Sequence, residues 1–170
     1  MIYYPIDPGA PFNANDLLLK MKGPFSSIIQ ANETMELCSR ALWVNCEPLQ
    51  LQQVLWHLLV NARDAIPHKG KITIVTTGIS ITNEYLANHP DASVGPFFCL
   101  SVSDKGCGIS AKDLPHIFEP FFFPSKSKTG LGLNFCREIA RTYGGWIEVK
   151  TRLGHGSTFS IFLPEVAVPK

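Results

Sequence analysis

A segment bounded by two prolines, Pro48 and Pro67, places the strongest constraint on the fold of this chain. Its apolar residues recur at the i, i+3, i+4 and i+7 spacing of one helix face. This face comprises Leu51, Val54, Leu55, Leu58, Leu59, Ala62, Ala65 and Ile66. Proline is tolerated at the start of a helix but ends one that has already begun. The pattern therefore predicts a long helix over residues 48–66 that packs against a sheet or another helix.

Three polar side chains form a second row beside the apolar face of this helix. His57, Asn61 and Asp64 are spaced i, i+4 and i+7, so they stack along one side. Most amphipathic helices have a solvated polar flank, and that is the simpler interpretation from this helix alone. A ligand site is the alternative, and the rest of the chain has to decide between the two.

The bulk composition excludes several classes of protein. The 170 residues suffice for one domain with a sizeable core, and they are 45% hydrophobic and 17% charged. A net charge of +1 provides no field for nucleic acid or a membrane surface. No apolar run approaches the roughly 18 residues that span a bilayer, and the N-terminus lacks a secretory signal. The five cysteines form no CxxC pair, so we expect buried free thiols and a cytoplasmic location.

Shorter patterns surround the long helix. Residues 1–15 are expected to be an extended lead-in, and Gly23 with Pro24 is expected to end a first helix. The other expected helices and strands are helices at 16–25, 111–121 and 131–143, and strands at 26–30, 41–46, 71–82, 97–104, 146–151 and 158–164. A loop or hairpin connection is expected at 83–96 and a mobile loop at 123–130. This mixture predicts a two-layer α/β sandwich, with one mixed sheet and helices on one of its faces.

The first of two glycine-rich turns, DKGCGI, follows a buried strand. Asp104 ends that strand, and a carboxylate fixed there can accept a hydrogen bond from an exocyclic amine such as that of adenine. Gly106 and Gly108 permit positive φ angles and a close approach of a ligand to the backbone. An ordinary tight turn explains the DxGxG pattern equally well.

The second turn, KTGLGL, runs directly into the helix expected at 131–143. Free N–H groups at a helix N-terminus make an anion site, and Gly130 and Gly132 leave it open. Lys126 and Lys128 lie just upstream as possible phosphate contacts, although a loop made soluble by lysines is the simpler explanation. Neither turn matches the Walker pattern or the dinucleotide fingerprint.

Taken together, five motifs resemble a known family. HLLVNARDAI, DKGCGI, FEPFF, KTGLGL and GHGSTF occur in the order found in the ATP-binding domain of sensor histidine kinases. That family shares the Bergerat fold with type II topoisomerases, ninety-kilodalton heat-shock chaperones and mismatch-repair ATPases. The likeness extends over residues 16–164. It implies an α+β fold, a two-layer sandwich whose mixed, mostly antiparallel sheet is covered by helices on one face.

The resemblance implies ATP and Mg²⁺ as ligands and assigns roles to single residues. Asn61 would coordinate the Mg²⁺ that bridges the triphosphate, since magnesium prefers oxygen ligands, and Asp64 would lie near the phosphates or their metal. Asp104 would bind the adenine amine. The resemblance assigns the remaining nucleotide contacts to Gly106, Gly108, Lys126, Lys128, Thr129, Gly130, Leu131, Gly132 and Leu133.

Two further pairs of residues receive less definite roles. Ser157, or its neighbour Thr158, would support Asp104 through water. Phe118 and Phe121 would anchor the loop that covers the nucleotide, unless they are plain core aromatics.

His57 discriminates between branches of this group. Members that hydrolyse ATP for mechanical work carry a glutamate at that position, whereas histidine or asparagine is usual in the kinases. The resemblance therefore implies that His57 positions phosphate or water, with a weak general-base role as the alternative. Transfer would rest on positioning and charge neutralisation.

The chain departs from the kinase pattern in two places. No histidine is followed by the glutamate of the phosphoacceptor motif, so the acceptor would lie on a separate dimerisation domain. The lid between FEPFF and TGLGL is short, and Lys128 stands where glycine is common. Nucleotide binding is thus better supported than transfer.

These observations predict a catalytic domain at 16–164, a linker at 1–15 and a C-terminal tail at 165–170. The predicted activity is transfer of the γ-phosphoryl group of MgATP to histidine on a dimerisation domain, with a response regulator receiver domain downstream. We expect no contact with nucleic acid or membrane by this domain, although the parent kinase can be membrane-anchored. The alternatives are a degenerate nucleotide-binding regulatory module and a related serine kinase or ATPase.

Overall fold

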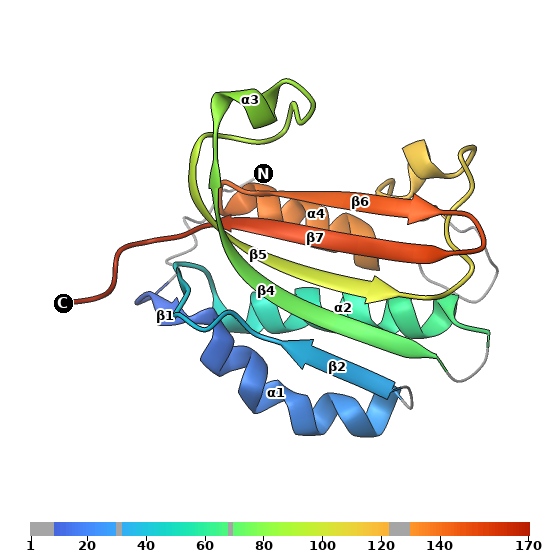
Figure 1. Cartoon of the computed structure of the whole chain (residues 1–170), viewed down its shortest axis with the longest axis horizontal. Coiled ribbons are helices and arrows are strands. Elements are labelled where there is room, and N and C mark those ends of the chain that lie inside the picture. Colours follow the sequence, from blue (N-terminus) through green and yellow to red (C-terminus); the bar gives the residue numbers. More distant parts are fainter. Residues whose placement is uncertain (1–8, 30–31, 68–69, 123–129) are drawn as a thin grey trace.

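The computed structural model describes residues 9–29, 32–67, 70–122 and 130–170. Its helices and strands, in chain order, are β1 (Phe12–Asn13), α1 (Ala14–Ile29), β2 (Asn32–Glu36), β3 (Trp43–Val44), α2 (Pro48–Ala65), β4 (Lys71–Ile81), α3 (Asn83–Leu86), β5 (Gly95–Asp104), the 3₁₀ turn η1 (Leu114–His116), α4 (Gly132–Thr142), β6 (Trp146–Arg152) and β7 (Gly156–Pro164). Figure 1 shows the main sheet in front of the helices.

The main sheet has five strands in the order β2-β4-β5-β7-β6 (Figure 1). Only β2 and β4 pair in parallel, and the other three pairs are antiparallel. The β6–β7 pair forms a C-terminal hairpin from two of the predicted strands, with Arg152 opposite Gly156 at its closed end. The mixed, mostly antiparallel sheet is confirmed.

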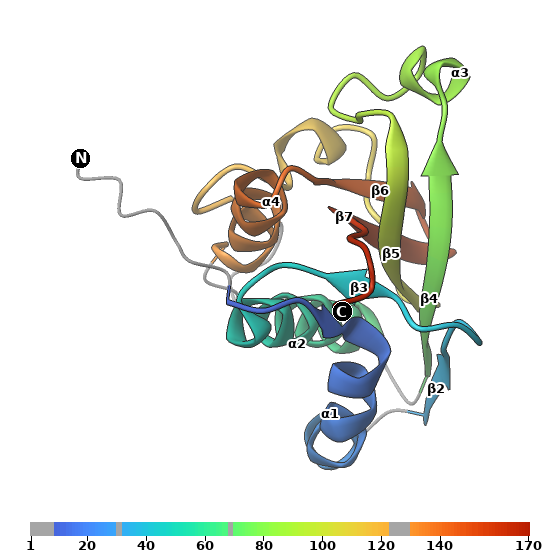
Figure 2. The same cartoon turned by 90° about the vertical axis from the view of Figure 1, so that its left-hand side faces the viewer.

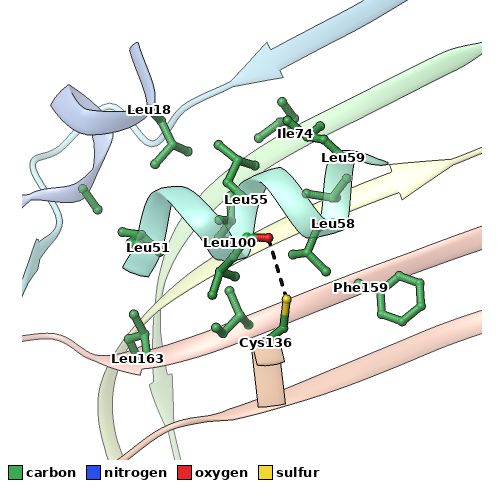
Figure 3. Packing of buried hydrophobic residues seen from close by; sticks show 14 of the residues in the cluster. Leu18, Leu51, Leu55, Leu58, Leu59, Ile74, Leu100, Cys136, Phe159 and Leu163 are labelled. Carbon is green, nitrogen blue, oxygen red and sulfur yellow. Dashed lines mark hydrogen bonds between the residues drawn. The ribbon is translucent and has the colours of Figure 1, made fainter. Parts of the chain in front are cut away.

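Helices α1, α2 and α4 cover one face of the sheet, as Figure 2 shows from the side. Between them lies the larger core, where the predicted stripe of α2 is buried from Leu51 to Ala62. Ala65 and Ile66 at its end are only half-buried. In Figure 3 the α2 leucines face Leu100 and Phe159 of the sheet, and the Cys136 thiol of α4 donates to the Val54 carbonyl at 3.8 Å.

The opposite face of the sheet carries a smaller cluster formed by Ile81, Phe97, Cys99, Trp146 and Phe162. The Trp146 and Phe162 rings stack with their centroids 4.6 Å apart. Tyr85 and Leu86 of α3 pack on this cluster. The segment between the antiparallel strands β4 and β5 is thus a hairpin connection that contains a short helix.

The first helix is longer than predicted, because α1 continues through Pro24 to Ile29. Proline inside a helix costs about 3 kcal/mol. The next turn buries Phe25 and Ile29 in the core, and each buried side chain of that size contributes roughly 1.5–3 kcal/mol. Burial therefore offsets the proline, and the strand predicted at 26–30 is wrong.

Other local predictions also need correction. Strand β2 at Asn32–Glu36, on the outer side of β4, was not predicted. The predicted extended lead-in gives way to helix at Ala14. The helix expected at 111–121 is reduced to the single turn η1, and the strand expected at 41–46 to the two residues of β3.

All five cysteines are free thiols. Cys46, Cys99 and Cys136 are buried and Cys38 is half-buried, as expected, but Cys107 is exposed. Burial raises the pKa of the Cys46 and Cys136 thiols to about 12. Within the described part of the chain, no helix has both the length and the apolarity that crossing a bilayer requires.

Candidate functional site

The polar row of α2 begins with His57, which lies at the interface with α4. Its ring is half-buried and tilts against the Phe135 ring at a centroid distance of 5.2 Å. Burial lowers the pKa of His57, because the charged imidazolium loses its hydration there. The imidazole is therefore neutral at physiological pH.

The turn that leads into α4 meets α2 at this histidine. An ideal Cβ on Gly132 would lie 3.0 Å from Nδ1 of His57, so the glycine allows the close approach of the two helices. Gly130 has a φ of 65°, and a Cβ there would lie 2.7 Å from the Phe122 carbonyl oxygen. The Phe121 N–H donates to the Gly130 carbonyl at 3.1 Å, which holds the two ends of the intervening segment together.

The first glycine turn contacts the C-terminal end of α2. Asp104 is 5% exposed, and its Oδ1 accepts a hydrogen bond from the Gly106 N–H at 2.8 Å. The Cys107 N–H donates to the Ala65 carbonyl at 3.0 Å. A Cβ on Gly106 would lie 2.3 Å from that same oxygen, so this turn is pressed directly onto the end of α2.

Both glycine turns therefore lie along one stretch of α2. The stretch runs from His57 to Ala65 and measures about 12 Å at the rise of an α-helix. Asn61 lies midway along it, on the side of the helix that His57 occupies. Residues that are far apart in sequence thus come together around Asn61.

The profile of the family described as "Histidine kinase-, DNA gyrase B-, and HSP90-like ATPase" matches residues 46–167. The chain belongs to this family.

Named relatives of this ATPase domain are sensor kinases. Sensor kinase CckA of Brucella abortus is 39% identical over 134 residues, which are 77% of this chain and 14% of that protein. The histidine-protein kinase AtoS of Escherichia coli is 36% identical over 121 residues, which are 71% of this chain and 18% of that protein. The ATPase domain thus spans less than a quarter of the length of either relative.

Solved structures agree with this assignment. The catalytic domain of histidine kinase ThkA, in a nucleotide-free form, is 27% identical with a TM-score of 0.71. The match covers 92% of this chain and 95% of that one. The predicted fold class and family are thereby confirmed, and the chain is an ATPase domain of the sensor-kinase type.

Side chains alternate between the two faces of β7, and this distinguishes Ser157 from Thr158 as the residue beside Asp104. Thr158 pairs with Ser103 across the strands, and their hydroxyls are 2.8 Å apart. Ser157 is therefore on the opposite face, which is the face of Asp104. Ser157 is 6% exposed, so it is the better placed of the two to support the carboxylate.

Thr151 of β6 has a role in the site that its sequence pattern does not indicate. Its hydroxyl oxygen accepts a hydrogen bond from the Ile109 N–H at 2.9 Å and lies 2.8 Å from the Ser157 hydroxyl. It thereby ties the β6–β7 hairpin to the turn that follows Asp104. A threonine in an alternating strand gives no signal of such a role.

The two phenylalanines of FEPFF differ in their surroundings. Phe118 is half-buried, its carbonyl accepts a bond from the Asn134 amide at 3.2 Å, and the Arg137 guanidinium lies 5.8 Å from its ring centroid. Phe121 is 67% exposed and has a φ of 62°. Phe121 is thus not a core aromatic.

The remaining predicted residues lie in different environments. Asp64 is exposed and pairs with Arg63 at 2.9 Å. Leu131 is 42% exposed, whereas Leu133 is half-buried against the core. Lys126, Lys128 and Thr129 lie outside the described residues, as does most of the loop expected at 123–130. Among described residues, no group of three or more His, Cys, Asp or Glu side chains could hold a metal ion.

Proposed function

We propose that this domain binds ATP with Mg²⁺ and transfers the γ-phosphoryl group to a histidine on a dimerisation domain of the parent sensor kinase. A response regulator receiver domain would take the phosphoryl group downstream. The observation that carries the proposal is the contact of both glycine turns with one stretch of α2, around Asn61.

The base would be bound at the turn after β5. The Asp104 carboxylate is buried and accepts a hydrogen bond from the Gly106 N–H. A carboxylate is a hydrogen-bond acceptor, so it suits the exocyclic amine of adenine. Gly106 and Gly108 have no room for a side chain, because a Cβ would lie 2.3 Å and 2.2 Å from backbone oxygens. Those oxygens belong to Ala65 and Arg152, so the two glycines seat the turn on α2 and β6 beside the proposed purine site. Ser157 would support Asp104 through water.

The phosphates would lie between Asn61 and the start of α4. That helix offers unpaired N–H groups at its first turn, and Lys126, Lys128 and Thr129 would add contacts from the lid. The Asn61 amide oxygen is a suitable ligand for Mg²⁺, which takes its other ligands from phosphates and water. When bound, Mg²⁺ would neutralise charge on the triphosphate. Asp64 shares its charge with Arg63, which favours a metal- or water-mediated contact.

His57 would position the phosphates or a water molecule rather than act as a strong base. Its lowered pKa keeps the ring neutral, so it adds no charge beside the triphosphate. The ring also packs against Phe135, with an interplanar angle of 56°. Phe118 and Phe121 would anchor the loop that covers the nucleotide.

We propose residues 16–164 as the catalytic unit, with residues 1–15 joining it to the dimerisation domain. The second candidate function is a regulatory module that binds nucleotide without transfer, favoured by the short segment between Phe122 and Gly130. A short lid would shield the phosphates from water less completely.

Transfer of labelled phosphate to an acceptor domain added in trans distinguishes these functions. We expect labelled histidine with the wild-type domain and MgATP. Asn61→Ala should bind ATP with little dependence on Mg²⁺ and should transfer no label. ATP binding without any transfer would support the regulatory module, and an undiminished Mg²⁺ dependence in Asn61→Ala would contradict the metal assignment.

A further inference from the structure

Strand β6 is the last strand of the sheet, and among the described residues no strand pairs with its outer side. In Figure 1 it lies along the upper edge. Such an edge presents backbone N–H and C=O groups that can pair with another extended segment. The outer side of β6 is therefore a potential interface.

A hollow of about 300 Å³ runs along this edge. Residues 146–150 of β6 line it from both faces of the strand, and His89 and Phe118 lie on its walls. Because five consecutive residues of β6 line it, the hollow follows the edge of the last strand. The next strand of a continued sheet would occupy this position.

The sequence of β6, WIEVKTR, is complementary to itself when one copy is turned by a half-rotation about Val149. The rotation places Glu148 of each copy opposite Lys150 of the other. It also places Arg152 opposite Trp146, whose ring is buried against Phe162, so the Glu148–Lys150 pairs carry the complementarity. Opposite charges in cross-strand positions stabilise antiparallel pairs, and like charges destabilise them.

The face of β6 that points away from the larger core carries these charges. Oε1 of Glu148 accepts hydrogen bonds from the Tyr85 hydroxyl at 2.7 Å and from the Trp146 indole at 2.8 Å. The carboxylate is thereby held in place, while Lys150 and Arg152 are exposed. The inner face is apolar, because Ile147 and Val149 pack toward the core.

We propose that two copies of this chain associate by antiparallel pairing of their β6 strands about a two-fold axis at Val149. The hollow along one strand would receive the β6 edge of the other copy, and two five-stranded sheets would become one. Such a contact uses the same surface on both subunits and closes with two members. No residue of either glycine turn lines the hollow. The far end of β6 does touch the first turn, because a Cβ on Gly108 would lie 2.2 Å from the Arg152 carbonyl oxygen.

Sedimentation velocity over a range of concentrations tests this interface. We expect a dimer of the wild-type chain that increases with concentration. In a dimer of Lys150→Glu, the new glutamate of each copy would lie opposite Glu148 of the other copy. This variant should therefore be monomeric at concentrations at which the wild type is dimeric. Lys112→Glu, an equal change of charge at an exposed lysine outside the hollow, should remain dimeric.

A mixture of two variants gives the sharper test. Glu148→Lys and Lys150→Glu each place like charges across the axis, but mixed together they restore two opposite-charge pairs. Each should be monomeric alone, and the mixture should form a heterodimer. A monomeric wild type, a Lys150→Glu variant as dimeric as the wild type, or folded variants that do not associate on mixing would overturn the proposal. If Glu148→Lys fails to fold by circular dichroism, the comparison of Lys150→Glu with Lys112→Glu decides.

Discussion

The His57 ring lies directly against Gly132, with Nδ1 3.0 Å from the position that a Cβ of residue 132 would take. This contact joins the polar row of α2 to the first residue of α4. It places the imidazole beside the start of α4, where we propose that the phosphates bind.

Gly132→Ala should disturb that arrangement while leaving the fold intact. The added methyl group forces a shift of the His57 ring or of the start of α4, because a 3.0 Å approach is too close. Overpacking of this kind costs about 1–3 kcal/mol, partly offset by the helix preference for alanine. We expect ATP affinity to fall several-fold, measured by calorimetry, with a small loss in the free energy of unfolding.

Gly23→Ala is the matched control for this substitution. Gly23 lies inside α1, and a Cβ there meets no heavy atom within 4 Å. Because Gly23 directly precedes Pro24, whose ring disfavours helical geometry in a residue with a Cβ, we expect no gain in stability. ATP affinity should be unchanged. Equal effects of both substitutions on ATP affinity would contradict a special role of residue 132.

The lowered pKa of His57 predicts a pH dependence of stability. Burial penalises the protonated ring in the folded state, so its contribution is present above the unfolded pKa of about 6.5 and is lost as the pH falls. Between about pH 7.5 and pH 5.5, the wild type should lose more free energy of unfolding than His57→Gln. Urea unfolding at both pH values measures this, and an identical loss in both proteins would show that His57 does not carry it.

Asp104→Asn tests the base site. The asparagine carbonyl can still accept the bond from the Gly106 N–H, so the fold should be retained. Loss of a charged hydrogen bond, about 1.5–3 kcal/mol, should weaken ATP binding roughly tenfold or more. Inosine triphosphate lacks the exocyclic amine and serves as the control ligand, because the wild type should prefer ATP and the variant should not. An unchanged preference would rule out the assignment.

Thr151→Val tests the tie between the hairpin and the turn after Asp104. Valine has nearly the same shape but leaves the Ile109 N–H without its acceptor, which costs about 1–3 kcal/mol. We expect weaker ATP binding together with a lower free energy of unfolding, and Thr151→Ser should restore both. A valine variant with wild-type values for both measurements would show that the hydroxyl is dispensable.

The sequence predicted those elements whose local pattern and tertiary role agree. Helix α2 was predicted because its apolar period is regular over many turns, and the burial from Leu51 to Ala62 follows it. The glycines at 106, 130 and 132 were identified by type, and the structure adds what they approach: Ala65, Phe122 and His57.

Elements that depend on tertiary contacts were missed. Helix α1 passes Pro24 because Phe25 reaches the core and stacks on Trp56 at 5.7 Å, which no local pattern reveals. Strand β2, NETME, has little apolar alternation and is held in place by parallel pairing with β4. The role of Thr151 likewise arises from a hydrogen bond between residues distant in sequence.

Titration with MgATP, followed by backbone amide chemical shifts, shows whether ATP binds where the two glycine turns meet α2. We expect the largest changes at residues 57–64, 104–109 and 130–134, with the amides of β6 beside the hollow little affected. Changes concentrated at residues 88–91 and 146–150, with the α2 row unmoved, would contradict it.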